Sequence, residues 1–507
     1  MRKIIITTLC LMLGILTFRS TGAEQKESPK PNVIIIVLGT LRADHLGCYG
    51  YPKNTSPNID KFAKECLLFK NAYSQSHWTL PSHCSILTSR YPSVHGVMER
   101  TAKLDPAEVT LPEILKNYDY QTAAFTGGLD MKKEHGLDQG FDVYSDDAGD
   151  KILGTSDNIF PKALNWLGSA NKDKPAGSPA NRGKPFFLYV HTYDTHLPYS
   201  PPASRCSDTG RSVSEGIGAP YNTMFAPGDY QGQFKGKKLS YEYLKTISGP
   251  LPKADIDYVV SQYDGEIAYQ DKQLGLFLDK IKESGLDKNT IIVITADHGE
   301  SLYDHGSWDR FNSEDLYNST LKVPLMIRLP DILPLKKGGL GGCPIRGDNN
   351  PLYPPLIRGN NLQTLIRNRQ VDTDVQLLDI MPSVLKQIGI PVNKDAQGID
   401  ILPKNTSRDY VMAESSLTKQ AFKKGNMKLI ASSALYELYD LDKDPQEQVN
   451  LASKNPDKVY EMIQELMGIL KRIRAERRTP PRITLSPQMI DELRKSGYWS
   501  KDDDSPR

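Results

Sequence analysis

Cysteine is scarce in this chain of 507 residues, which carries only six scattered thiols. They form no Cys-x-x-Cys pair and no Cys/His spacing typical of a structural zinc site. The sequence therefore excludes a fold that depends on a framework of disulfides, although one bridge is compatible with it. The six are Cys10, Cys48, Cys66, Cys84, Cys206 and Cys343.

An excess of charge of either sign is also absent. The chain has 63 basic and 61 acidic residues, which gives a formal net charge of +2. No basic stripe interleaved with aromatics runs through it, so we expect no nucleic acid among its partners. Hydrophobic residues make up 38% and charged residues 24%, which is typical of a soluble protein with a buried core.

Long hydrophobic runs are missing except near the N-terminus. Arg2 and Lys3 precede the apolar stretch 4–18, and small residues follow around Ala23. This order is typical of a secretory signal peptide over residues 1–23, whereas the apolar stretch is short for a membrane anchor. We expect a secreted or periplasmic protein with no stable membrane span after cleavage.

Apolar, strand-like runs alternate with helical patterns along the rest of the chain. Residues 32–38 form a continuous Val/Ile run, typical of a strand covered on both faces. The alternation predicts an α/β fold with a mostly parallel central sheet flanked by helices. Further strands are expected over 121–126, 186–193, 290–295 and 323–329, and helices over 57–67, 254–284 and 371–388.

The pattern predicts one large domain and a smaller C-terminal part. The large domain is expected over residues 32–400. Short strands followed by a helix over 456–476 predict an α+β subdomain over 405–480, and residues 481–507 are expected to be a tail. Three long polar or glycine-rich loops are either specificity elements or surface decoration. They span 171–185, 205–250 and 336–355.

Three of the expected strands end in polar sequence. Leu38 is followed by GTLRAD, Val190 by HTYDTH and Thr295 by ADHGE. Ligands bind beyond the carboxyl ends of parallel strands, so these segments are expected to meet at one site. Asp297 and His298 offer a carboxylate and an imidazole there, which predicts a metal site. The alternative is that Asp297 caps a turn and His298 lies at the surface.

The segment WTLPSHCSIL supplies a hydroxyl in a special position. Thr79 precedes a proline and an apolar helical pattern, which puts it at a helix N-terminus. It could simply cap the helix. A hydroxyl at a helix end can also attack an anionic substrate, but a neutral threonine needs activation by a metal or a base. A nucleophilic role for Thr79 therefore requires the metal site.

Many ordered segments of the chain resemble the sulfatase family, within the alkaline-phosphatase-like superfamily. The resemblance covers about residues 32–475 and implies an alkaline-phosphatase-like fold. It also implies hydrolysis of sulfate, phosphate or phosphonate esters, or phosphoryl transfer. The segments are TLRADHLGCYGYPKNTSPNIDKFAKE, WTLPSHCSILTSRYPSVHGV, GLDQGFDVY, FFLYVHTYDTHLPY, YDGEIAYQDKQLG, TADHGESLYDHG, VQLLDIMPSVLKQIGI, QGIDIL and ELYDLDKDPQEQVNL.

The resemblance implies a role for five residues of this chain. Thr79 is implied as the nucleophile, with His83 beside it, and His196 as a contact of the substrate. Asp297 and His298 are implied as ligands of a divalent metal ion, together with the Thr79 hydroxyl. The ion is expected to be calcium, or zinc or manganese given the threonine nucleophile.

The chain departs from the family pattern at the nucleophile. Typical members carry C-x-P-S-R or S-x-P-S-R, whose first residue becomes formylglycine, whereas this chain has TLPSH. Threonine cannot be oxidised to an aldehyde, and Cys84 is followed by SIL and does not satisfy the motif. No formylglycine is therefore expected. Threonine does serve as nucleophile in phosphoryl-transferring relatives.

Two further departures affect the charge of the expected site. Gly39 stands where relatives have their first metal-binding Asp, and Asp44 is the nearby substitute. Asn312 stands near a position where relatives often have His or Lys, and Arg310 is the candidate that supplies the missing charge. If these changes damaged a metal site, Gly39→Asp is expected to raise activity.

These features leave two classes of function. The first is an exported hydrolase that cleaves sulfate esters of small molecules or glycans by metal-assisted attack of Thr79, with His196 and Arg310 stabilising the anion. Phosphate or phosphonate ester hydrolysis and phosphoryl transfer are alternatives within the same superfamily. The second class is a catalytically impaired protein that keeps the pocket to bind an anionic saccharide or peptide, as Gly39 and Asn312 indicate.

Overall fold

The structure is a computed structural model that describes residues 30–495 except for the gaps given at the end of this paragraph. The expected signal peptide, the end of the expected tail and much of the three expected loops lie outside the described residues. So do Arg310 and Asn312. The gaps are 150–152, 170–182, 201–220, 238, 245, 248, 307, 309–315, 332–368, 404–405 and 434.

The centre of the molecule is an eight-stranded sheet. Its strands are β1 (Asn32–Leu38), β2 (Leu67–Tyr73), β3 (Gln121–Phe125), β4 (Val143–Ser145), β5 (Phe186–Thr192), β6 (Thr290–Thr295), β7 (Lys322–Arg328) and β8 (Arg369–Gln376). They follow the order β4-β3-β5-β1-β6-β7-β2-β8. β7 runs antiparallel to β6 and β2, and the other neighbouring pairs are parallel. The mostly parallel sheet predicted from the sequence is confirmed.

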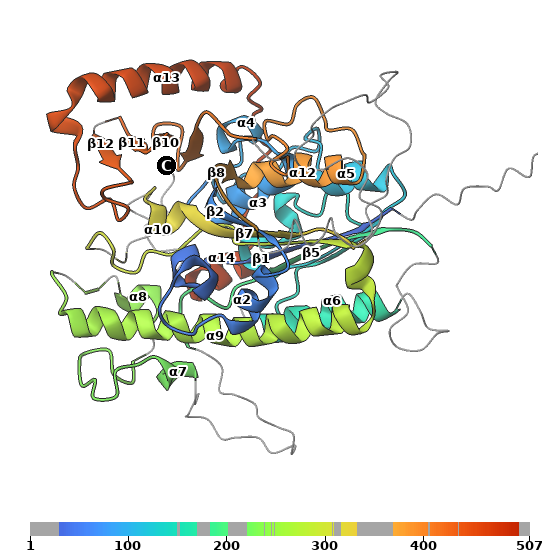
Figure 1. The fold of residues 1–507 in the computed structure, drawn as a ribbon, viewed down its shortest axis with the longest axis horizontal. Coiled ribbons are helices and arrows are strands. Elements are labelled where there is room, and N and C mark those ends of the chain that lie inside the picture. Colours follow the sequence, from blue (N-terminus) through green and yellow to red (C-terminus); the bar gives the residue numbers. More distant parts are fainter. Residues whose placement is uncertain are drawn as a thin grey trace, which may run out of the picture.

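Helices cover both faces of this sheet, as Figure 1 shows. The 31-residue α9 (Lys253–Glu283) lies along one face with α6 (Ser156–Ser169) and α2 (Pro57–Ala63). On the other face lie α3 (Thr79–Thr88), α5 (Leu111–Lys116) and α12 (Ile380–Gln387). β5 and β6 are buried along their whole length, because both of their faces meet a helical layer. The short helices are α4 (Pro92–His95), α7 (Tyr221–Met224), α8 (Tyr241–Leu244) and α10 (Asn318–Leu321).

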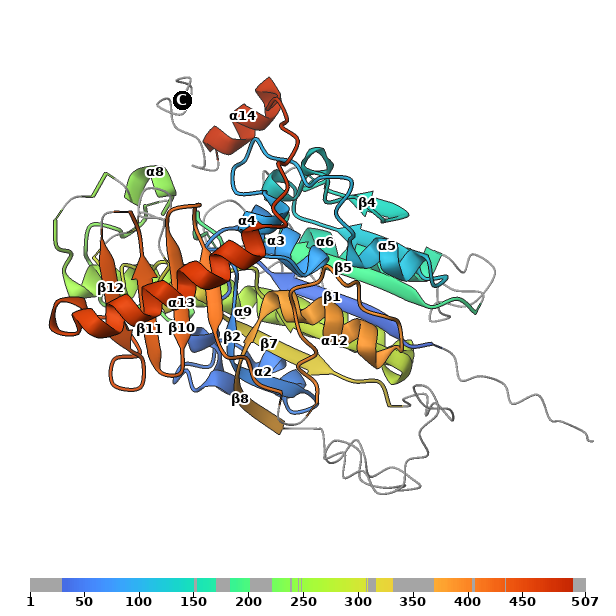
Figure 2. The same cartoon turned by 90° about the horizontal axis from the view of Figure 1, so that it is seen from above.

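A smaller antiparallel sheet forms the C-terminal subdomain (Figure 2). Its strands are β9 (Val411–Glu414), β10 (Gln420–Lys424), β11 (Met427–Ala431) and β12 (Tyr436–Asp440), in the order β12-β11-β10-β9. Helix α13 (Pro456–Arg474) crosses this sheet and buries Leu466 against it. Val94 of α4 and Tyr91, the N-cap of α4, belong to the same core. Helix α14 (Pro487–Lys495), within the expected tail, packs Met489 and Leu493 into the core of the large domain.

The structure corrects the predicted helix over 371–388. Residues 369–376 form the edge strand β8, which pairs in parallel with β2, and α12 begins only at Ile380. In the sequence RQVDTDVQ, half-buried and exposed residues alternate at the start of the strand, as is typical of an edge strand. Its apolar residues also fit a helical spacing, which explains the wrong prediction. The sequence also fails to predict β2, which follows α2 closely, and the short β10.

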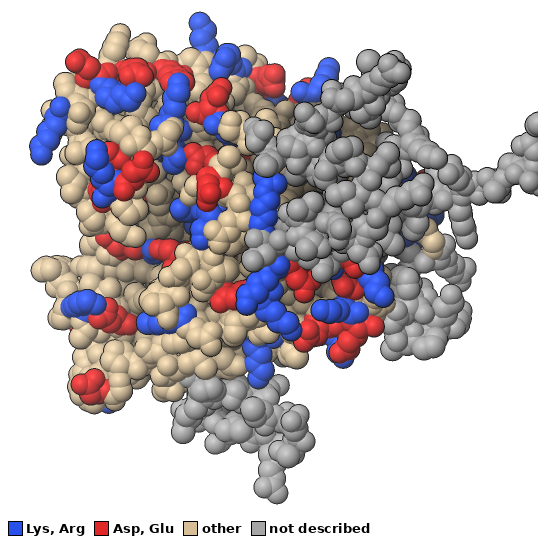
Figure 3. Space-filling view, in the orientation of Figure 1, with Lys and Arg blue, Asp and Glu red and all other residues tan. Residues whose placement is uncertain are grey.

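Charges of both signs are interspersed over the face of the molecule drawn in Figure 3. This mixture matches the small net charge of the sequence. No helix in the described part of the chain is long and apolar enough to cross a membrane.

Three of the six cysteines fall in described segments, and all three are free thiols. They are Cys48, Cys66 and Cys84. Cys66 is a buried core residue, as its sequence pattern predicts. The other three cysteines lie outside the described residues.

A buried carboxylate on α9 holds the start of α2 in place. Asp271 accepts hydrogen bonds from the backbone N–H groups of Asn58 and Ile59 at 3.0 and 2.7 Å, and from the Asn58 side-chain amide at 2.8 Å. The first N–H groups of a helix have no acceptor within the helix, so Asp271 satisfies them from outside.

We expect Asp271→Ala to lower the free energy of unfolding by about 1–3 kcal/mol, because two N–H groups would lose their acceptor. Urea denaturation measures the change. Asp279→Ala, at an exposed position of the same helix, is the matched control and should leave the stability nearly unchanged. Equal stabilities for the two variants would contradict this role of Asp271.

Candidate functional site

The carboxyl ends of three adjacent strands meet at one edge of the sheet. β1 lies between β5 and β6, with Val37 paired to His191 on one side and to Thr295 on the other. The N–H of Gly39 donates to the backbone carbonyl of Thr192 on β5 at 2.8 Å. This hydrogen bond continues the pairing of the two strands one residue beyond β1. This register brings Gly39, His191 and Asp297 to the same edge, as the polar strand ends predict.

Helix α3 brings two more candidate residues to the site. Thr79 is its first residue, and His83 follows one turn later on the same side of the helix. All ten residues of α3 are buried. The hydroxyl of Ser82 lies 2.8 Å from that of Ser74 and anchors the helix to the segment after β2. The predicted position of Thr79 at a helix N-terminus is confirmed.

Asp297 is fully buried, and only one of its oxygens is hydrogen-bonded. Oδ1 accepts from the backbone N–H groups of Thr40 and His298 at 3.0 and 2.9 Å. Oδ2 has no hydrogen-bond partner among the described residues. Burial alone would raise the pKa of this carboxyl, but the imidazoles of His298, His83 and His191 lower it well below its usual range. The site thus contains a buried negative charge with one oxygen open to a ligand.

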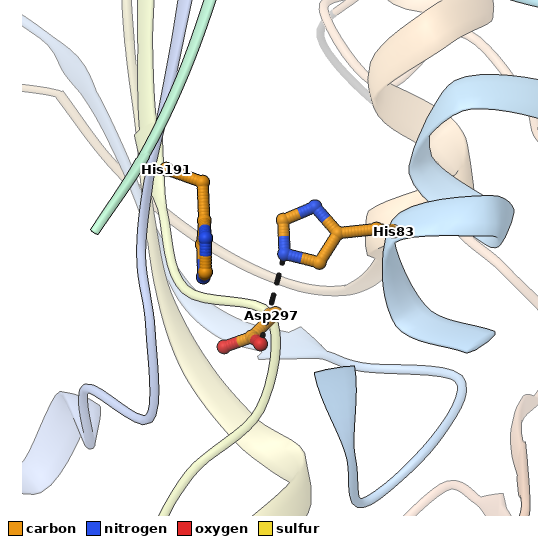
Figure 4. A group of neighbouring side chains, drawn as sticks. All are labelled: His83, His191 and Asp297. Carbon is orange, nitrogen blue, oxygen red and sulfur yellow. Dashed lines mark ion pairs between the residues drawn. The ribbon is translucent and has the colours of Figure 1, made fainter. Parts of the chain in front are cut away.

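Two imidazoles face that open oxygen (Figure 4). His83 Nε2 lies 3.7 Å from Asp297 Oδ2. One ligand atom from each of His83, His191 and Asp297 lies within 4.8 Å of the other two. Within the described ranges, neither His83 Nε2 nor either nitrogen of His191 has a hydrogen-bond partner. Burial, and then the nearby His83, lower the pKa of His191 well below its usual range and so keep its ring neutral.

The second ring nitrogen of His83 fixes the orientation of the first. His83 Nδ1 lies 2.6 Å from the Tyr189 hydroxyl on β5. The rings of His83 and His191 also meet edge to face, with centroids 4.6 Å apart. Metal-binding imidazoles are commonly oriented in this way, by a hydrogen bond on the nitrogen that does not bind the ion.

Thr79 is paired with His298. Its Oγ1 lies 3.3 Å from His298 Nε2, and His298 Nδ1 lies 2.8 Å from the carbonyl oxygen of Gly299. A carbonyl only accepts hydrogen bonds, so Nδ1 carries the proton and Nε2 is the acceptor nitrogen. Thr79 therefore donates toward Nε2, which is the arrangement of a nucleophile beside its base. His298 Nε2 also lies 3.5 Å from Asp297 Oδ2, so the pair adjoins the His83–His191–Asp297 cluster.

His196 belongs to the same neighbourhood. The ring of Tyr193 packs edge to face against both His191 and His196, with centroids 4.4 and 5.8 Å apart. The phenol of Tyr193 donates a long hydrogen bond to the carbonyl oxygen of Gly128 at 3.5 Å. Tyr193 therefore lies between His191 and the expected substrate contact His196.

Asp44 lies elsewhere. Its carboxylate forms an ion pair with Arg42 at 2.8 Å and lines a cleft of about 560 Å³ beside the C-terminal subdomain. The lining of that cleft includes neither Thr79 nor Asp297. The expectation that Asp44 stands in for a carboxylate at position 39 finds no support in this geometry, because the adjacent guanidinium binds the Asp44 carboxylate.

His191 is the site residue that the sequence reading missed. Its signal was present, since an imidazole ends the otherwise apolar run FFLYV, where a buried polar group needs a partner. The decisive fact is its register opposite Val37, which only the pairing of β5 with β1 supplies. The strand-end pair Asp297 and His298 therefore does not by itself identify the group formed by His83, His191 and Asp297.

The donor set fits a bound divalent metal ion. Two imidazole nitrogens with one carboxylate oxygen form the protein ligands of many catalytic zinc sites, which keep a further position open. In the described part of the chain these three donors have no other hydrogen-bond partner, and they lie within 4.8 Å of one another. An ion between them would satisfy all three.

Comparison with known proteins gives a family and a set of relatives. The family model described as Sulfatase matches residues 31–390 of this chain. An ulvan-active sulfatase of Formosa agariphila is 27% identical over 376 residues, which cover 71% of this chain and 69% of that protein. An N-acetylglucosamine-6-O-sulfatase of Bacteroides thetaiotaomicron is 24% identical and covers 88% of this chain and 87% of its own length.

Solved structures share the same fold. A protein in complex with its substrate D-glucosamine-2-N,6-O-disulfate superposes with a TM-score of 0.62 at 20% identity, over 88% of this chain and 98% of that chain. The phosphonate monoester hydrolase of Agrobacterium radiobacter gives 0.62 at 19% identity, over 88% and 96%. The alkaline-phosphatase-like fold implied by the sequence is thereby confirmed.

Proposed function

Because this chain belongs to the sulfatase family, we propose that it is an exported hydrolase that cleaves sulfate esters of glycans with Thr79 as nucleophile. The observation that carries the proposal is the pairing of Thr79 Oγ1 with His298 Nε2 at 3.3 Å, beside the buried group His83, His191 and Asp297, which could hold a cation. The relatives support a sulfated saccharide as substrate, since they include an ulvan-active sulfatase, an N-acetylglucosamine-6-O-sulfatase and a protein bound to a disulfated glucosamine.

In the proposed first step, Thr79 Oγ attacks the sulfur of the ester while its proton passes to His298 Nε2. The bond between sulfur and the ester oxygen breaks, and the alcohol leaves with a proton from solvent. In the second step, water attacks the sulfur of the sulfated threonine and the bond to Thr79 breaks. The attacking water gives one proton to solvent, which offsets the proton taken up by the alcohol. Thr79 recovers its proton from His298, and hydrogen sulfate leaves. Water must attack at sulfur, because threonine lacks the aldehyde chemistry of formylglycine.

A bound divalent ion would supply positive charge beside the transferred group and favour ionisation of the threonine hydroxyl. His83, His191 and Asp297 are the residues that would hold it. Their imidazole-rich set favours zinc over manganese and over calcium, which prefers six to eight oxygen ligands. In this proposal, His196 and the Tyr193 phenol contact the substrate anion and its leaving group.

Phosphate or phosphonate ester hydrolysis is the second candidate. Thr79 is a residue that phosphoryl-transferring relatives use, and the phosphonate monoester hydrolase shares the fold. A single assay series separates the two, in which the same alcohol is presented as a sulfate, a phosphate and a phosphonate ester.

We expect Thr79→Ala to lower kcat/KM for sulfated glycans or aryl sulfates about 10³-fold or more, because the attacking oxygen is removed. Thr79→Ser, which keeps the hydroxyl, should retain a measurable fraction of the rate. Rapid quenching followed by mass spectrometry should show the peptide that contains Thr79 heavier by one SO₃ group. Turnover that survives Thr79→Ala unchanged would rule out the assigned nucleophile, and ligand binding without any turnover would favour the non-catalytic alternative.

We expect His298→Gln to lower kcat about 10²–10⁴-fold, because the proton of Thr79 loses its acceptor. Steady-state kinetics measure this loss, and a thermal melt checks that the variant is folded. A rate close to that of the unchanged protein would show that His298 does not act as the base.

A further inference from the structure

Gly39 lies directly against the ring of His191. A Cβ atom at position 39 would lie 3.0 Å from His191 Nε2 and 2.7 Å from the backbone carbonyl oxygen of Thr192. Both distances are shorter than ordinary contact, so a side chain at position 39 would displace the imidazole or the end of β5. Gly39 is not among the residues with positive φ, so lack of space explains the glycine better than backbone conformation does.

The imidazole that fills this space lacks the hydrogen bonds that a buried polar group normally has. His191 is fully buried, and within the described part of the chain neither of its ring nitrogens has a hydrogen-bond partner. The same holds for His83 Nε2 and for Asp297 Oδ2. Polar atoms that are buried together without partners are unfavourable, and one cation between them would satisfy three of these four atoms, one from each residue.

We propose that His83, His191 and Asp297 bind one transition-metal ion of the zinc class, and that Gly39 is a required part of this site because His191 occupies the space of a side chain at position 39. The metal site is thus built around an imidazole from β5. This inference goes beyond the proposed hydrolysis and does not rest on it, since an ion can be held here whether or not Thr79 reacts.

The geometry favours a compact ion with few ligands. Ligands about 2.0–2.1 Å from a tetrahedral zinc ion lie about 3.3 Å from one another. The 3.7 Å between His83 Nε2 and Asp297 Oδ2 needs only a small closure to reach that value. The hydrogen bond of His83 Nδ1 to Tyr189 already holds the ring in the required orientation.

The proposal reverses the expected effect of a carboxylate at position 39. Gly39→Asp adds a potential oxygen ligand, but its Cβ would press on His191 and on the backbone of β5. We therefore expect Gly39→Asp to weaken zinc binding. Even Gly39→Ala, which adds and removes no ligand, should weaken it.

The test is the zinc dissociation constant of the full chain, measured by competition with a chromophoric chelator. We expect one zinc ion per chain, weakened about 100-fold or more in His191→Gln and about 10-fold or more in Gly39→Ala. Gly468→Ala is the matched control, because Gly468 is exposed on α13 and no atom lies within 4 Å of a Cβ there. It should bind zinc like the unchanged protein. Thermal melts confirm that each variant is folded.

Cobalt substitution gives a second readout that does not depend on affinity. The visible absorption of the cobalt-loaded protein should change in His191→Gln at saturating metal, because a nitrogen ligand is lost. If His191→Gln and Gly39→Ala both bind zinc as tightly as the unchanged protein, the proposal is wrong. It is also wrong if the unchanged protein binds no zinc. A chain that holds zinc as described but hydrolyses no ester would contradict the proposed function alone. A chain that hydrolyses esters but binds no zinc would contradict this inference.

Discussion

The burial of one carboxylate, Asp297, determines the organisation of the candidate site. One of its oxygens is held by two backbone N–H groups, so the other is left facing the imidazoles of His83, His191 and His298. A charge in this position is tolerable only with cationic or hydrogen-bonding partners. His298 in turn connects the carboxylate to the Thr79 hydroxyl. The proposed nucleophile, its proposed base and the proposed metal ligands therefore lie around one buried carboxylate.

The fold supplies this centre through the order of its strands. β1 lies between β5 and β6. The residues at the carboxyl ends of these three strands are therefore neighbours, although they are far apart in the sequence. Helix α3 adds Thr79 and His83 from one buried face. The close approach of β1 and β5 at Gly39 has a structural consequence, because the space that a side chain would take there is filled by His191. The position after β1 thus has no side chain, and the imidazole of His191 on the neighbouring β5 takes its place.

Much of this could be predicted from sequence, and the exceptions have physical causes. The run at 32–38, the Asp297-His298 strand end and the helix start at Thr79 are local signals, and the structure places each as expected. His191 was missed because its role depends on strand pairing, which no local pattern encodes. The sequence predicts a helix where the edge strand β8 lies, because the half-buried residues of this strand fit both the two-residue period of a strand and the 3.6-residue period of a helix. The implied role of Asp44 depended on its closeness in sequence to Gly39, but its carboxylate pairs with Arg42 instead.

The central claim is that a metal ion lies between α3, β5 and the end of β6. Anomalous X-ray diffraction from crystals of the zinc-loaded protein, recorded on both sides of the zinc absorption edge, tests it most directly. The account predicts one strong peak within bonding distance of His83 Nε2, a ring nitrogen of His191 and Asp297 Oδ2. A peak bound by His298 and Thr79 without His191, or no peak at this edge of the sheet, would contradict it.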